Sequence, residues 1–260
     1  MTLIDTLYPR RCPATGRTCQ RCPRPSRLLV CLPAGTTCDR DHLARSLARA
    51  IRPHIASAGS ALIGRHFVLW RTPGATESAL LVLPQPDPVL PVTWCAGGPA
   101  GLLDLRTTAA MVRAALDSEA ADWQRRIADT TPTARAWWQY HDEFRRDPGA
   151  YPLAEAVAEF EAQPRITAMA AAGDTYRSDM YGPGLEALSE GAGAYAAYKT
   201  GLALYGDGLV DLTGQLLLPA PSPTLVEQTH AERRLYHDRA RRYLTTLDPG
   251  VVLAAVLCHR

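Results

Sequence analysis

The first 42 residues limit most strongly how this chain can fold. Five of its seven cysteines lie within residues 12–38, and a histidine follows four positions later. Residues 1–26 are rich in proline, arginine and cysteine and have little apolar content with which to build a core. A segment of this kind needs a metal ion or disulfide bonds to hold its loops together.

The best-spaced subset of these side chains is Cys19-x2-Cys22-x15-Cys38-x3-His42, which is close to the spacing of small structural zinc sites. Cys19 and Cys22 form a CxxC knuckle. Cys38 and His42 are four positions apart, so the first turn of a helix brings them to one side. The sequence therefore predicts a structural Zn²⁺ site with these four ligands.

Other ligand sets remain open. Cys12 and Cys31 can replace the second pair of ligands. Together with the knuckle they also offer four thiolates to an iron–sulfur cluster, although their spacing matches no common ferredoxin. A third interpretation is that the cysteines are free thiols, and Cys31 and Cys95 fit well as small hydrophobic core residues.

Charge is divided unevenly along the chain. Residues 1–65 carry 11 arginines against three acidic residues, a balance of +8, whereas residues 66–260 carry 17 basic and 23 acidic residues, a balance of −6. The chain has a single lysine and no asparagine, which is typical of a GC-rich bacterial genome, so its arginine content alone is weak evidence. The asymmetry indicates either an anionic partner for the basic segment or its docking on the chain's own acidic residues.

Nucleic acid is the predicted anionic partner. Cationic loops held in place by a metal are a common way to contact a phosphate backbone, and each contact adds salt-dependent affinity. No helix-turn-helix or RNA-recognition motif accompanies the arginines. The predicted nucleic-acid-binding residues are Arg10, Arg11, Arg17, Arg21, Arg24, Arg27, Arg45, Arg49, Arg52, Arg234 and Arg241.

The hydrophobic pattern predicts an α+β fold. Arg27–Pro33 has the composition of a short buried strand. Leu43, Leu47, Ile51 and Ile55 form the apolar stripe of a helix that Asp39 or Thr37 caps. Strands are also expected over Arg65–Arg71 and Ser78–Leu83, which form a hairpin, and over Val89–Cys95. These elements predict a small metal-stapled mixed α/β unit over residues 1–96.

The rest of the chain is expected to form a mainly helical domain over residues 102–260, with a hairpin or ordered loop near residues 205–218. Gly97–Gly101 is the best boundary between the two domains. Aromatic residues at helical spacing, such as those of Trp137–Phe144, are expected in the core. A long arginine-rich helix is predicted at about Thr224–Leu247.

The helical domain also contains residues that could carry out acid–base or metal chemistry. Glu227-x-x-His230 has the spacing of carboxylate-bridged metal helices, which normally occur in pairs, and no second copy is evident. The remaining candidates are His141, Glu143, Glu155 and Glu159. A charged, solvated helix surface explains all of these residues more simply.

The location of the protein is predicted from the ends of the sequence. Met1–Pro9 has no apolar run typical of a signal peptide. Val251–Cys258 is too short to span a bilayer, which takes about 20 residues. A cytoplasmic protein without a membrane partner is therefore expected, and a reducing compartment favours a metal over disulfides.

Together these features predict a zinc-stabilised, non-enzymatic nucleic-acid-binding protein, for DNA or RNA, acting as a subunit of a larger nucleoprotein assembly. Its acidic residues are expected to contact neighbouring proteins. One alternative is a metal-dependent enzyme with its site in the helical domain. A second alternative is a protein–protein interaction module whose zinc is structural.

Overall fold

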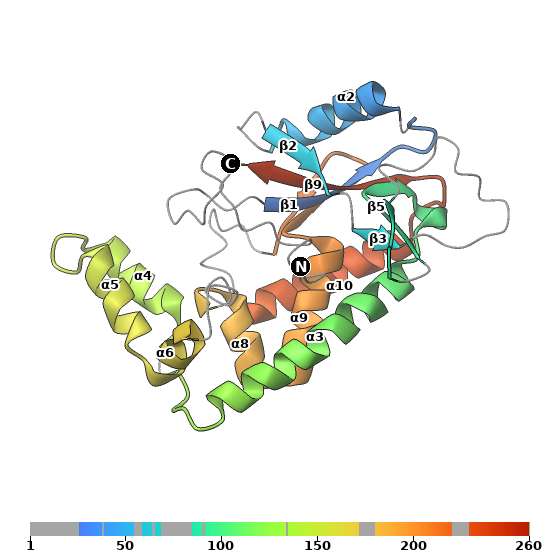
Figure 1. Cartoon of the computed structure of the whole chain (residues 1–260). Helices are drawn as coiled ribbons and strands as arrows, with labels where there is room; N and C mark the ends of the chain where they lie inside the picture. Colours follow the sequence, from blue (N-terminus) through green and yellow to red (C-terminus); the bar gives the residue numbers. More distant parts are fainter. Residues whose placement is uncertain are drawn as a thin grey trace. The chain divides into compact units, whose positions relative to one another are not determined.

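The computed structural model describes residues 26–37, 39–54, 59–63, 66–68, 85–89, 92–133, 135–171, 180–219 and 229–259 (Figure 1). These residues form a mixed α/β structure, as the sequence predicts, with helices and two β-sheets. The chain divides into two compact units, each assembled from separate stretches of sequence. Unit 1 contains residues 1–112, 201–218 and 237–260, and unit 2 contains residues 113–200 and 219–236.

The main sheet of unit 1 is built around the last strand of the chain. The strands of this sheet are β1 (Ser26–Leu32), β2 (Gly59–Leu62), β6 (Gly97–Pro99), β7 (Gly208–Val210), β8 (Leu216–Leu217) and β9 (Val252–His259). On one side β9 pairs antiparallel with the whole of β1, and on the other side with both β2 and β6. On its far side β1 pairs in parallel with β7, which pairs antiparallel with β8.

Strand β1 is buried along its whole length, which confirms the strand predicted at this position. Its sequence, SRLLVCL, is almost continuously apolar, as expected of a strand that is covered on both faces. Successive side chains point to opposite faces of a sheet. Leu28, Val30 and Leu32 therefore face one layer of core, while Leu29 and Cys31 face the other.

Helix α2 (Arg40–Ile51) covers the first of these faces (Figure 1). The carboxylate of Asp39 caps it by accepting a hydrogen bond of 2.9 Å from the backbone N–H of His42. Leu43, Leu47 and Ile51 of the predicted stripe are buried against β1 and β9, as expected, and Ile55 lies outside the described residues. Each such burial contributes roughly 1.5–3 kcal/mol, so α2 is held firmly on the sheet.

A second, three-stranded sheet in unit 1 has the strand order β3-β5-β4 and consists of β3 (Phe67–Val68), β5 (Thr93–Cys95) and β4 (Gln85–Pro86). The first predicted strand of the hairpin thus contains β3, which pairs antiparallel with β5. Its predicted partner, 78–83, lies outside the described residues. The backbone N–H of Val68 donates to Thr108 Oγ1 at 2.9 Å, which fixes β3 to the start of helix α3 (Leu105–Ile127).

Helix α3 continues into unit 2, where shorter helices follow it in the sequence. These are α4 (Trp137–Arg146), α5 (Leu153–Glu161), α6 (Pro164–Ala171) and α8 (Pro183–Glu190), and then α9 (Ala192–Tyr205) and α10 (His230–Thr245), which, like α3, have residues in both units. The ring of Trp137 packs edge-on against the rings of Phe160 and Tyr181, with centroid distances of 5.4 and 5.0 Å. Trp137 and Tyr140 of α4 are therefore buried in the core, as predicted, whereas Trp138 is exposed. Among the described helices, none combines the length and apolar character needed to cross a membrane.

Candidate nucleic-acid interface

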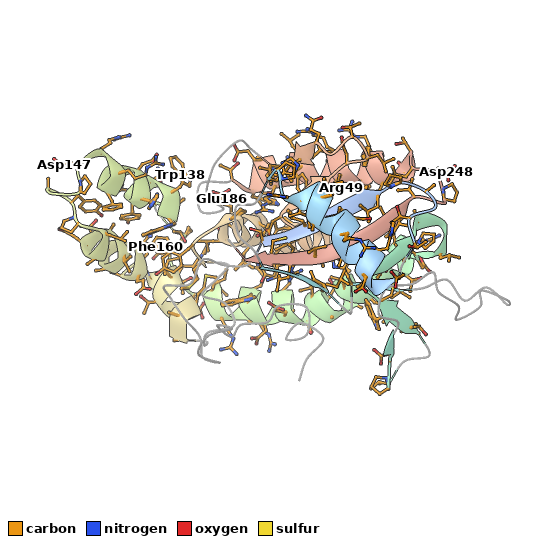
Figure 2. All side chains as sticks on the ribbon, turned by 90° about the horizontal axis from the view of Figure 1, so that it is seen from above. Arg49, Trp138, Asp147, Phe160, Glu186 and Asp248 are labelled. Atoms are coloured by element: carbon orange, nitrogen blue, oxygen red, sulfur yellow. The ribbon has the colours of Figure 1, made fainter. Side chains whose placement is uncertain are left out.

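The outer face of α2 carries a row of cationic side chains. Residues 42, 45, 49 and 52 recur at intervals of three and four, so they lie on one face of the helix, opposite its apolar stripe. His42, Arg45, Arg49 and Arg52 are all exposed. Figure 2, which is seen from above, looks onto α2 and labels Arg49. Sequence periodicity alone predicts this placement, and the structure shows it.

We refer to Arg45, Arg49 and Arg52 as the α2 arginine stripe. Elsewhere arginines are paired with acids, for example Arg135 with Glu143 at 2.7 Å. Within the described ranges, in contrast, no acidic side chain forms an ion pair with a member of the stripe. Its first and last members, Arg45 and the C-cap Arg52, are seven positions apart, about 10.5 Å along the axis. The stripe therefore presents three exposed positive charges in a line.

The other arginines that the sequence predicts as phosphate ligands are buried, exposed on another helix, or outside the described residues. Arg27 is only 5% exposed in β1, and its backbone N–H donates to Asp207 Oδ2 at 2.9 Å, so it is not part of the exposed surface. Arg234 and Arg241 are exposed on α10, and Arg241 pairs with Asp238 at 3.2 Å. The remaining members, Arg10, Arg11, Arg17, Arg21 and Arg24, lie outside the described residues.

Two of the six candidate metal ligands lie in the described part of the chain. His42 is exposed in the first turn of α2, whereas Cys31 is buried in β1. Burial, and next the nearby Asp211 carboxylate, raise the pKa of the Cys31 thiol to about 12. A thiolate is the form that binds metals. Without a metal Cys31 is a buried, protonated thiol, which suits a core residue, as the buried Cys95 also does.

The predicted ligands Cys12, Cys19, Cys22 and Cys38 lie outside the described residues. In the ranges that are described, no three or more histidine, cysteine, aspartate or glutamate side chains come together in a way that could hold a metal ion.

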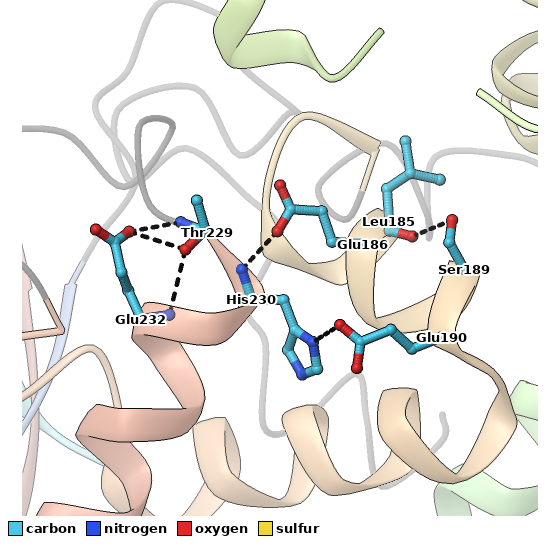
Figure 3. Close-up of polar contacts among 7 residues, drawn as sticks. All are labelled: Leu185, Glu186, Ser189, Glu190, Thr229, His230 and Glu232. Atoms are coloured by element: carbon cyan, nitrogen blue, oxygen red, sulfur yellow. Dashed lines mark hydrogen bonds and ion pairs between the residues drawn. The ribbon is translucent and has the colours of Figure 1, made fainter. Parts of the chain in front are cut away.

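The start of α10 contains a polar cluster that the sequence predicts only in part (Figure 3). His230 is 4% exposed, and its Nδ1 lies 2.7 Å from Glu190 Oε1. The backbone N–H of the same residue donates to Glu186 Oε2 at 2.6 Å. Thr229 and Glu232 form reciprocal hydrogen bonds around this first turn, which is a capping box.

This cluster satisfies the free N–H groups of the first turn of α10 and attaches that turn to α8. Glu186 and Glu190 are four positions apart in α8, so both carboxylates lie on the same face of that helix. The sequence therefore contained one sign of this cluster, the Glu-x-x-x-Glu spacing of Glu186 and Glu190. It could not be connected to His230, because 40 positions separate Glu190 from the histidine.

Two of the other acid–base candidates, Glu143 and Glu159, form surface contacts on α4 and α5, whereas the ring of His141 packs near Trp137 and Phe144. Glu143 pairs with Arg135, whose guanidinium lies 4.2 Å from the centroid of the Tyr140 ring. Glu159 accepts a hydrogen bond of 2.8 Å from Tyr151 Oη. These contacts join each helix to the loop that precedes it, which is the arrangement of a charged protein surface.

Comparison with known proteins adds no identification: the chain matches no family model, and no curated protein and no solved structure shows significant similarity to it.

Proposed function

We propose that this chain is a non-enzymatic nucleic-acid-binding protein and that the α2 arginine stripe contacts phosphates of its partner. One observation carries the proposal: Arg45, Arg49 and Arg52 are exposed on one helix face and have no ion pair with any acid in the described part of the chain. The +8 balance of residues 1–65 places further arginines in the same segment of sequence. Charge of one sign concentrated in this way attracts a polyanion.

The setting of the stripe suits this role. Because Leu43, Leu47 and Ile51 are buried beneath it, α2 holds the three guanidinium groups on a fixed support. A rigid support lowers the entropy that binding would otherwise cost. Guanidinium groups also form two parallel hydrogen bonds to a phosphate, which a lysine cannot do.

Neutralising the stripe is expected to weaken binding and to reduce its salt dependence. In the triple variant Arg45→Gln, Arg49→Gln, Arg52→Gln, the plot of log K against log salt concentration for a 20-base-pair DNA duplex should become shallower by about 2–3, since each lost phosphate contact removes about 0.9 from the slope. Fluorescence anisotropy at several salt concentrations measures both affinity and slope.

A matched control removes the same charge from elsewhere. Arg113, Arg125 and Arg146 are exposed on α3 and α4. Their replacement by glutamine should leave the slope within about 0.5 of the wild-type value, because they lie outside the proposed interface. Equal losses in the two triple variants would show that only net charge matters. Wild-type affinity that does not change with salt would contradict the proposal.

A structural zinc ion bound by Cys19, Cys22, Cys38 and His42 is the second part of the proposal. It would staple the basic part of residues 1–96, leaving residues 102–260 as the mainly helical part that contacts other proteins. The exposed imidazole of His42 fits this role, because it lies at the first turn of α2 and no described side chain covers it. Bound zinc would supply folding free energy to a segment with few apolar residues.

Metal analysis tests the zinc site. Protein purified without added metal is expected to contain one zinc per chain and to be colourless, and Cys22→Ser is expected to lose the metal. Cys12→Ser is the control and should keep it. Zinc lost from Cys12→Ser but kept in Cys38→Ser would show that the alternative ligand set binds the metal. A brown chromophore would indicate an iron–sulfur cluster instead.

A further inference from the structure

We infer that the partner is a double-stranded nucleic acid, bound through its phosphate backbone without preference for base sequence. This inference rests on the proposed function and specifies its ligand. Proteins that bind single strands use aromatic side chains on which successive bases stack. Proteins that read base sequence place amide or guanidinium groups against base edges. The side chains available around the α2 arginine stripe distinguish among these modes.

Apart from His42, which the zinc proposal assigns to the metal, the exposed face of α2 carries no ring on which a base could stack. Ala44 and Ala48 are exposed beside the arginines of the stripe. These small side chains allow a phosphate backbone to approach the helix closely, but they offer no ring to a base. The same is true of the whole basic segment. Residues 1–65 contain 11 arginines but only one aromatic residue, Tyr8. A single strand would therefore have to be ordered with almost no stacking.

Apart from its arginines, which can also bind guanine, residues that read bases are equally scarce in this segment. Glutamine and asparagine recognise adenine through two hydrogen bonds. Residues 1–65 contain one glutamine, Gln20, and no asparagine. The segment thus provides positive charge and little else. A duplex offers the complementary feature, since its phosphates are already held in a regular, rigid array. The fixed line of three guanidinium groups on α2 matches that array.

A competition experiment tests the inference. Labelled DNA and RNA duplexes of 20 base pairs, their separated strands and a second pair of duplexes of unrelated sequence are titrated with the full chain at one salt concentration. At least one type of duplex should bind about tenfold more tightly than its own strands, and duplexes of different sequence should agree within about threefold.

The outcomes separate this inference from the proposed function. Single strands that bind as tightly as duplexes, or one duplex sequence preferred by tenfold or more, would overturn the inference and leave nucleic-acid binding intact. Absence of binding to every probe, even at low salt, would overturn the proposed function itself.

A gain-of-function variant tests the physical reason. Ala48→Trp places an aromatic ring on the exposed face of α2, between the positions of the stripe. Because one stacked base contributes substantially to affinity, single strands should bind about tenfold more tightly while duplex affinity stays within about threefold. The matched control is Ala154→Trp, at an exposed position of α5. It should change neither the single-strand affinity nor the duplex affinity. Unchanged single-strand affinity in Ala48→Trp would overturn the inference that missing aromatic residues determine the choice of ligand.

Discussion

Replacing Gly97 with alanine is expected to destabilise unit 1 by at least about 3 kcal/mol. Gly97 lies in β6, paired with Ala254 of β9. An added Cβ would lie 2.0 Å from the carbonyl oxygen of Leu253 and 2.8 Å from the Cα of Ala254. Both are backbone atoms of a central strand, so they cannot move without breaking the pairing around them. Denaturant unfolding followed by circular dichroism measures the loss.

The same substitution at a second glycine is the control. Gly193 lies in α9, and an added Cβ would meet nothing within 4 Å. Gly193→Ala should leave stability unchanged or raise it by up to about 1 kcal/mol, because alanine favours a helix more than glycine does. Equal stability of Gly97→Ala and Gly193→Ala would show that β6 does not approach β9 as closely as described.

Acidification is expected to remove about 3 kcal/mol of stability through a single buried histidine, His66. This side chain is 3% exposed, and its Nε2 lies 3.1 Å from the carbonyl oxygen of Leu204. Burial lowers its pKa from 6.5 to about 4, opposed by this hydrogen bond and assisted by the positive charge of Arg27. The folded protein therefore keeps His66 neutral in a range of pH where the unfolded chain binds a proton.

The sign of the effect follows from proton binding. Above pH 6.5 neither state binds a proton at His66, and the fold keeps its full stability. As the pH falls from 6.5 to about 4 the unfolded state gains the proton first, so stability is lost across this range and the loss levels off below it. Unfolding free energies of the wild type and His66→Gln at pH 7, 5.5 and 4 test this. The glutamine variant should lose about 3 kcal/mol less than the wild type on acidification. Parallel losses in the two proteins would contradict the assignment.

Periodicity in the sequence predicted the parts of the fold that depend on neighbouring residues. The buried strand β1 and the apolar stripe of α2 were evident because each reflects a local repeat of two or of three to four residues. The exposed α2 arginine stripe follows from the same argument, since residues opposite an apolar stripe face solvent. The α2 part of the candidate interface was therefore accessible from sequence.

Contacts between segments that lie far apart in the sequence could not be predicted. Val251–Cys258 reads as a short apolar run, and no local signal shows that β9 is the central strand of a sheet or that it pairs with β1. The burial of Arg27 was not predicted either. Its place in an arginine-rich segment suggested exposure, whereas the residue is buried in β1. The division into 1–96 and 102–260 stays a prediction, and the compact units draw on separate stretches of the chain because of these long-range pairings.

The position of β9 has a consequence for how the protein is made. Leu28 pairs with Val256, and β2 and β6 also depend on β9 for their place in the sheet. As the ribosome releases the chain from its N-terminus, β1 must wait until Gly208–Val210 has been made before it can pair with β7, and until Val252–His259 has been made before it can pair with β9. Contacts this far apart in sequence are slow to form, and unpaired strand edges are prone to aggregate in the meantime. The nascent chain should accordingly need protection by chaperones until synthesis has passed β9.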